Sequence, residues 1–142
     1  MAQKTYFFSG KASWAKVFQP DTKYGVKYTI DVALDENSLD LFRSSGSRIK
    51  ERKDEKTGEI FVKFARDEEG IKKGEKITYG PPHVYGSDGK TPFTELIGNG
   101  STVTCKVEVY DSAHGKGTRL VSVRVDDHVP FEGNVVVGEE LF

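Results

Sequence analysis

The alternation that decides the fold runs through residues 23–34, which read KYGVKYTIDVAL. Every second residue from Tyr24 to Leu34 is apolar, apart from the tyrosine hydroxyls. Successive side chains of a strand point to opposite faces, so one face of this segment can be buried completely. The other face carries Lys23, Lys27 and Asp31. The segment therefore predicts a long strand with one face on the core and one face in solvent.

Four other segments show the same period of two: residues 12–18, 60–64, 102–110 and 120–126. Residues 19–22, with the sequence QPDT, have turn composition, so the first two strands should form a hairpin. The last two strands each offer an apolar face to the core, formed by Val103, Cys105, Val107 and Val109 in one and by Val121, Val123 and Val125 in the other. Five or more alternating strands predict a small closed or partly closed barrel.

One short helix should interrupt the strands. It is expected to begin near Asp35, because acids then occupy its first turn, and Gly46 can end it. Residues 67–100 are rich in turn residues and predict only short edge strands, at residues 77–79 and 83–85 around Pro81 and Pro82. The fold class is therefore mainly β, with one short helix.

Two of the predicted strands place aromatic rings beside lysines on the outer face. In residues 60–64, Ile60, Val62 and Phe64 supply a complete core face, which leaves Phe61 and Lys63 together on the other face. In residues 12–18, the small or apolar side chains of Ser13, Ala15 and Val17 are expected to face inward. The outer face then carries Trp14, Lys16 and Phe18.

A ring beside a cation on an open sheet face is what single-stranded nucleic acid binding requires, because the ring stacks on a base and the cation meets a phosphate. Lys23 and Lys27 lie on the non-core face of the neighbouring strand and extend the cationic lining. Weaker candidates for the same role, each more often a solvated surface residue, are Lys106, Tyr110, Arg119 and Arg124.

Charge is distributed unevenly along the 142 residues, whose net charge is −1. Five acids and no lysine or arginine follow Arg124, so the last 17 residues carry −5 and the first 125 carry +4. A mildly basic body with an acidic tail suits a polyanionic partner better than the net charge suggests. The length is that of one domain, large enough to bury a sizeable core.

Other function classes find little support in the sequence. The single cysteine, Cys105, cannot form an internal disulfide and is expected to be a small buried hydrophobe in a protein of the reducing cytoplasm. The three histidines are far apart and none has metal-ligand spacing. No nucleophile or phosphate-binding motif is present, and no apolar run is long enough to cross a bilayer. We therefore expect no enzyme activity, cofactor, metal or membrane association.

Several segments resemble the single-stranded DNA-binding proteins of tailed bacteriophages. They are residues 9–18 (SGKASWAKVF), Gly80-Pro81-Pro82, residues 96–101 (LIGNGS), residues 116–120 (KGTRL) and the region of Val125 and Asp126. The resemblance spans most of residues 5–131, and the IGNGS segment is its most specific part. It implies an OB-fold-like barrel of five to seven strands, and a non-catalytic protein that binds exposed DNA strands during replication, recombination and repair.

The resemblance also implies a division of the chain into two parts. Residues 1–130 form the DNA-binding domain, and residues 131–142 form a short acidic C-terminal tail that ends in Phe142. Such tails contact replication or recombination proteins of the phage and compete with DNA. Here the corresponding residues are Glu139, Glu140, Leu141 and Phe142, in a tail that is shorter and less acidic than the best-known ones.

Two alternatives remain open at this point. Trp14, Lys16 and Phe18 can instead pack beneath the helix or against a second copy in a homodimer. The exposed aromatics can also serve a structural β-domain of a virion, as a protein-binding patch rather than a DNA-binding face.

Overall fold

A computed structural model of the chain describes residues 3–21, 26–72, 74–112 and 115–129. These ranges hold one helix, α1 (Glu36–Ser44), and nine strands. The strands are β1 (Gln3–Asp21), β2 (Lys27–Leu34), β3 (Arg52–Lys53), β4 (Ile60–Asp67), β5 (Glu69–Lys72), β6 (Glu75–Thr78), β7 (His83–Tyr85), β8 (Thr102–Ser112) and β9 (Gly115–Asp127). The predicted mainly β fold with one short helix is confirmed.

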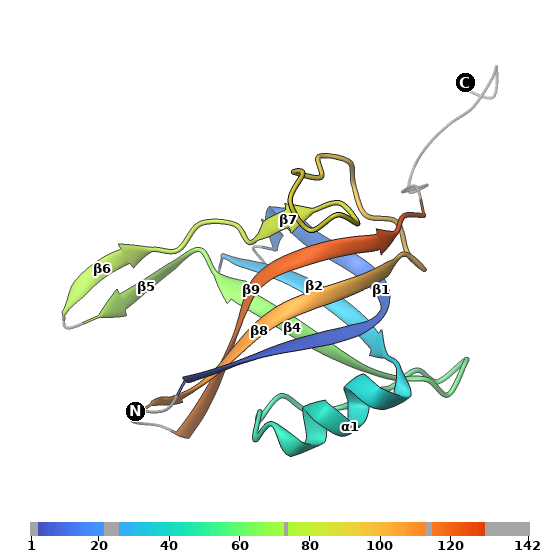
Figure 1. Cartoon of the computed structure of the whole chain (residues 1–142). Helices are drawn as coiled ribbons and strands as arrows, with labels where there is room; N and C mark the ends of the chain where they lie inside the picture. The colour runs from blue at the N-terminus through green and yellow to red at the C-terminus, as the bar shows by residue number, and fades with distance from the viewer. Residues whose placement is uncertain (1–2, 22–25, 73, 113–114, 130–142) are drawn as a thin grey trace, which may run out of the picture.

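Seven of these strands form one curved sheet in the order β3-β4-β2-β1-β8-β9-β7 (Figure 1). All neighbours in it are antiparallel except β7, which runs parallel to β9 at the edge. β5 and β6 form a separate two-stranded hairpin that projects from the body (Figure 1). The prediction of an edge strand at residues 83–85 is confirmed, whereas residues 75–78 belong to the projecting hairpin and not to the main sheet.

Strand β1 connects the two halves of the sheet because it is long enough to pair with two neighbours. Its first half pairs with β8 and its second half with β2, and Gly10 and Lys11 have partners on both. A Cβ atom on Gly10 would lie 2.1 Å from the carbonyl oxygen of Ala33. Only glycine permits this close approach of two backbones where the strand changes partners.

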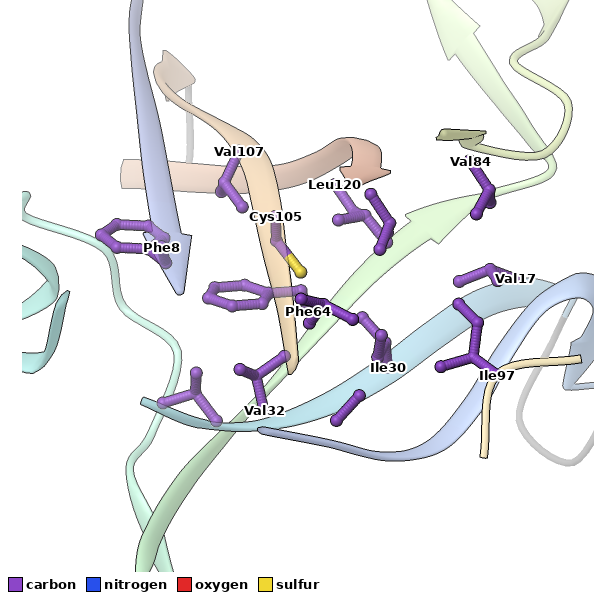
Figure 2. Close-up of a cluster of buried hydrophobic side chains, with 14 of the residues drawn as sticks. Phe8, Val17, Ile30, Val32, Phe64, Val84, Ile97, Cys105, Val107 and Leu120 are labelled. Carbon is purple, nitrogen blue, oxygen red and sulfur yellow. The ribbon is translucent and has the colours of Figure 1, made fainter. Parts of the chain in front are cut away.

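The core is formed by the inner faces of these strands (Figure 2). Phe8 and Phe64 stack with ring centroids 5.6 Å apart, and the ring of Phe42 from α1 meets both edge-on. Cys105 lies fully buried, as predicted, and burial raises the pKa of its thiol to about 12. The thiol is therefore inert and serves as an apolar core group.

Helix α1 begins where the sequence predicts. The Asp35 carboxylate accepts a hydrogen bond from the Ser38 N–H at 2.8 Å, which caps the first turn. The Ser38 hydroxyl in turn accepts the Ser9 N–H at 2.8 Å, so the same turn is tied to β1. The helix therefore lies against one end of the sheet (Figure 1), with Phe42 buried. Within the described ranges, no helix is long and apolar enough to cross a membrane.

The sheet has the predicted number of strands for an OB-type barrel, but it does not close as a hydrogen-bonded barrel. Its two edges are β3 and β7, which do not pair with each other. β4 and β9 approach one another, and the guanidinium of Arg66 spans the gap by donating to the carbonyl oxygens of Leu120, Tyr79 and Gly80 at 2.9–3.2 Å. A side chain occupies the position that a backbone ladder would take, so of the two predicted forms, closed or partly closed, the sheet adopts the partly closed one.

One predicted core position in β9 is wrong. A register shift between the Lys106 and Val107 pairs places Val121 in a bulge opposite β8. Leu120 consequently takes the buried position, and Val121 is only half-buried. Val103, Val107, Val109, Val123 and Val125 are buried as predicted.

Candidate nucleic-acid interface

The outer face of β1, β2 and β4 brings the two predicted aromatic–lysine groups together. Cross-strand pairing sets Ser13 opposite Asp31 and Asp31 opposite Lys63, while Phe61 lies opposite Ala33 one row away. Paired residues point to the same side of a sheet. A shallow pocket between the strands is lined by Ser13, Trp14, Asp31, Ala33, Asp54, Glu59 and Phe61. Trp14 and Phe61, 47 positions apart in the sequence, therefore lie at one site.

Trp14 is the most exposed large apolar side chain of the described residues, at 67%. It lies in a β-bulge between Ser13 and Lys16, and its φ of 50° is the only positive value at a described residue other than glycine. The bulge corrects one prediction: Ser13 is on the outer face opposite Asp31, not on the inner face. The extra residue restores the parity, so Val17 is buried as expected.

Lys16 and Lys27 lie on the same outer side. Lys16 has its Cα partner Thr29 on the outer face of β2. Phe18 is 36% exposed, but a second register shift follows Lys16 and gives Phe18 no Cα partner on β2. Lys27 is exposed and forms an ion pair with Asp67 at 3.7 Å. The Lys63 ammonium is 3.8 Å from Asp31 Oδ1. The two groups singled out from the sequence thus form one surface, hereafter the β1–β2–β4 face.

Asp31 is an acid beneath the cations of this face. Its side chain is only 13% exposed, and its buried Oδ1 has no hydrogen-bond partner within the described ranges. Desolvation raises the pKa of the Asp31 carboxyl, and the positive charges of Lys63, Arg52 and Lys16 oppose that shift without cancelling it. The ionised carboxylate is therefore held at a net cost to the folded state.

Replacing this acid with its neutral isostere, Asp31→Asn, should stabilise the fold at neutral pH. The pKa of Asp31 is higher in the folded state than the value of about 4 in the unfolded state. The protonated acid therefore stabilises the folded state fully below about pH 4, and this stability is lost as the pH rises through the folded-state pKa. The variant's advantage in urea unfolding should therefore be present at neutral pH and shrink toward about pH 4. Asp40→Asn, which removes an exposed carboxylate from α1, is the matched control. An Asp31→Asn variant less stable than the parent at neutral pH would show that the Lys63 ion pair outweighs desolvation.

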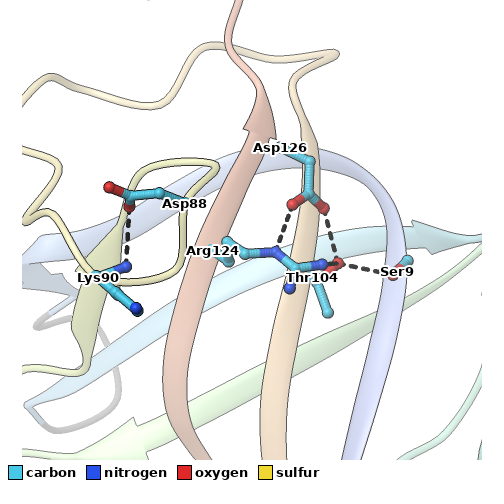
Figure 3. Close-up of polar contacts among 6 residues, drawn as sticks. All are labelled: Ser9, Asp88, Lys90, Thr104, Arg124 and Asp126. Carbon is cyan, nitrogen blue, oxygen red and sulfur yellow. Dashed lines mark hydrogen bonds and ion pairs between the residues drawn. The ribbon is translucent and has the colours of Figure 1, made fainter.

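Lys106 and Arg124 lie on the other half of the sheet, on β8 and β9. The guanidinium of Arg124 is held by Asp126 at 2.6 Å and donates to Thr104 Oγ1 at 3.1 Å (Figure 3). Thr104 donates to Asp126 at 2.7 Å, so the contact between its hydroxyl and that of Ser9 must be donated by Ser9. Arg124 is thus part of a closed polar network, and the structure leaves its predicted DNA contact untested.

Figure 3 also shows the turn beside this network, in which the Asp88 carboxylate accepts the N–H of Lys90 at 2.9 Å. Hydrogen bonds from the Thr91 hydroxyl and from the N–H groups of Thr91 and Lys90 lower the pKa of Asp88 to about 2. This acid stays ionised as a turn-forming group and contributes nothing to the β1–β2–β4 face.

Tyr110 and Arg119 meet in a different cluster at the base of the projecting hairpin. The Arg119 guanidinium lies over the ring of Tyr79 at 4.5 Å and over the ring of Tyr110 at 5.0 Å, and it is 3.9 Å from Glu108. Such a sandwich stabilises the fold without a ligand. The two residues are not brought to the pocket beside Trp14, and their contact with DNA stays a prediction.

Lys23 and the tail residues Glu139, Glu140, Leu141 and Phe142 lie outside the described residues. Their predicted roles, and the boundary between domain and tail at residue 130, therefore stay predictions. Among the residues that are described, no three His, Cys, Asp or Glu side chains are grouped as metal ligands.

Two exposed residues on the outer side of the sheet were missed from the sequence, one on the β1–β2–β4 face and one outside it. Arg52 lies in a charged segment without periodicity, yet β3 pairs it with Phe61 and so adds a cation to the face. Phe7 is 58% exposed and lies opposite Lys106 across β1 and β8. The sequence could have predicted that Phe7 is exposed, because adjacent strand residues cannot both face the core and the neighbouring Phe8 is buried.

Comparisons with known proteins agree on the architecture. No protein-family profile and no curated protein sequence matches the chain. Among solved structures, gp2.5, a single-stranded DNA-binding protein encoded by bacteriophage T7, superposes with a TM-score of 0.60 at 19% identity, covering 99% of this chain and 98% of its own.

The single-stranded DNA-binding protein from bacteriophage Enc34 superposes with a TM-score of 0.57 at 14% identity, over 94% of this chain and 87% of that chain. The structure of the Enc34 protein in complex with single-stranded DNA superposes with a TM-score of 0.59 at 13% identity, over 92% of this chain and 89% of that chain. The identities are low, so the likeness establishes the fold. The curved sheet with its single helix is therefore the fold that these two single-stranded DNA-binding proteins of bacteriophages also have.

Proposed function

We propose that this chain is a non-enzymatic protein that binds single-stranded DNA on the β1–β2–β4 face with little base preference. The observation that carries the proposal is that Trp14 and Phe61, from distant segments, line one pocket with Lys16 and Lys63 on the same side of the sheet. The fold shared with proteins that bind single-stranded DNA, one of them solved with that ligand, supports it.

The mechanism follows from the two kinds of group on this face. Each ring offers a surface on which any base can stack, at about 1–3 kcal/mol per base. The cations Lys11, Lys16, Arg52 and Lys63 project from the same outer side, to meet the phosphates between stacked bases. Stacking does not distinguish among bases because all have a π face, so binding is expected to be sequence-independent.

Salt dependence tests the proposal directly. If about four phosphates are neutralised, the logarithm of the affinity for oligo-dT should fall with the logarithm of salt concentration with a slope of about −3. The measurement is a titration of Trp14 emission at several salt concentrations, since Trp14 is the single tryptophan. A virion protein that uses this patch for protein contacts would show no saturable, salt-sensitive quenching, and that result would reject the proposal.

The biological setting is part of the same proposal. We place the protein in the cytoplasm of a bacterial host, where it would coat exposed strands during replication, recombination or repair of phage DNA. Contacts with phage replication or recombination proteins through residues 139–142, and a homodimer, remain predictions from the sequence.

A further inference from the structure

The bulge in β1 leaves Trp14 out of the Cα register with β2. Ser13 pairs with Asp31 and Lys16 with Thr29, but Trp14 has no Cα partner on β2. Its N–H donates instead to the side-chain oxygen Oδ1 of Asn99 at 2.8 Å. The donor is a backbone N–H, so the atom of Asn99 that accepts must be the oxygen. A residue 85 positions away therefore completes the bulge.

Asn99 lies on a turn that is also hydrogen-bonded to Ala12 of β1, two residues before this contact. The Gly100 N–H donates to the Ala12 carbonyl at 2.8 Å, and the Ala12 N–H donates to the Ser101 carbonyl at 2.7 Å. Gly100 has a φ of 92°, a conformation in which a residue with a Cβ atom is strained. The turn is thus aligned with residues 12–14 by three hydrogen bonds, one of which the Asn99 side chain accepts.

The far side of the turn is anchored in the protein body. Ile97 is a core residue, and the Ser101 side chain is fully buried. The Ser101 hydroxyl and the backbone of Val129 exchange hydrogen bonds at 2.8 and 3.1 Å, and the Gly98 N–H donates to the Val129 carbonyl at 2.9 Å. Asn99 is therefore an exposed side chain on a rigid support.

From these contacts we infer that Asn99 is a positioning residue for DNA binding, which holds Trp14 in its left-handed conformation so that the indole stands ready to stack on a base. A bulky residue adopts positive φ only where its surroundings impose it. A ring held in place before binding loses less conformational freedom when a base stacks on it. The inference rests on the proposed function, because it assigns Asn99 a role through Trp14 at the same face.

The test combines Asn99→Leu with Trp14→Ala in a double-mutant cycle, read as affinity for oligo-dT. Asn99→Leu removes the acceptor at similar size and should weaken binding roughly three- to tenfold. In the Trp14→Ala background, the same change should have no further effect, because the ring on which Asn99 acts is absent. Since the hydrogen bond is exposed to water, urea unfolding should show little change in either background.

Asn99→Asp is the rescue variant, because a carboxylate keeps an acceptor oxygen at this position. Its affinity, compared with the parent at raised salt where the added charge is screened, should be restored nearly in full. The inference would be overturned if Asn99→Leu lowered the affinity for oligo-dT equally with and without the Trp14 ring, or did not lower it at all. The DNA-binding proposal would then remain intact. Absence of oligo-dT binding by the parent protein would reject both.

Discussion

Replacing both Trp14 and Phe61 with alanine should weaken binding to oligo-dT by about 2–6 kcal/mol, since each stacked base contributes about 1–3 kcal/mol. Either single replacement should cost about half of that. Both side chains line the pocket on the outer face, and the core lies on the opposite side of β1 and β4. The free energy of unfolding should therefore change little. Anisotropy of a labelled oligonucleotide measures the affinity even when the tryptophan is gone.

The chain offers a matched control for this experiment in Phe7. Its ring is 58% exposed, comparable to Trp14, but it lies opposite Lys106 on the other half of the sheet. Phe7→Ala removes an equally accessible ring from the same strand, and we expect it to leave the affinity nearly unchanged. If Phe7→Ala weakened binding as much as Trp14→Ala, or if the double replacement had no effect, the assignment of DNA to the β1–β2–β4 face would be wrong.

The second large effect concerns stability. Phe64→Ala should lower the free energy of unfolding by about 3–5 kcal/mol, because it leaves a cavity at the centre of the aromatic cluster. The Phe64 side chain is fully buried, stacks on Phe8 at 5.6 Å and meets Phe42 edge-on at 6.3 Å. A domain of this size has a total stability of about 5–15 kcal/mol, so this one change removes a large share of it. Urea unfolding measures the loss.

Phe64→Leu is the corresponding control, since it keeps most of the apolar volume and should cost much less than the alanine variant. Phe64 faces the core, next along β4 to the outward Lys63. The folded fraction of either variant should therefore still bind oligo-dT. A loss below about 1 kcal/mol for Phe64→Ala would mean that the three rings do not form a packed unit.

The period of two in the sequence predicted most of the fold correctly. It located the long strands and the core valines of β8 and β9, and it put Trp14, Phe61 and Lys63 on the outer side. These features are local, because the alternation of side chains along a strand depends only on backbone geometry. The errors fall at bulges: Ser13 and Val121 were assigned to the core, and an inserted residue reversed the parity at both. A bulge forms in response to the neighbouring strand, so the segment itself carries no signal of it.

The outward position of Phe61 and Lys63 on β4 was determined by the sequence alone. Tertiary structure decided that Trp14 and Phe61 line one pocket and that the Asn99 side chain accepts the Trp14 N–H. It also decided that Asp31 is desolvated near three cations. Each of these depends on which strands become neighbours and on how closely they approach. Strand pairing joins residues far apart in the chain, and the chemistry of each pair arises only once the sheet has formed.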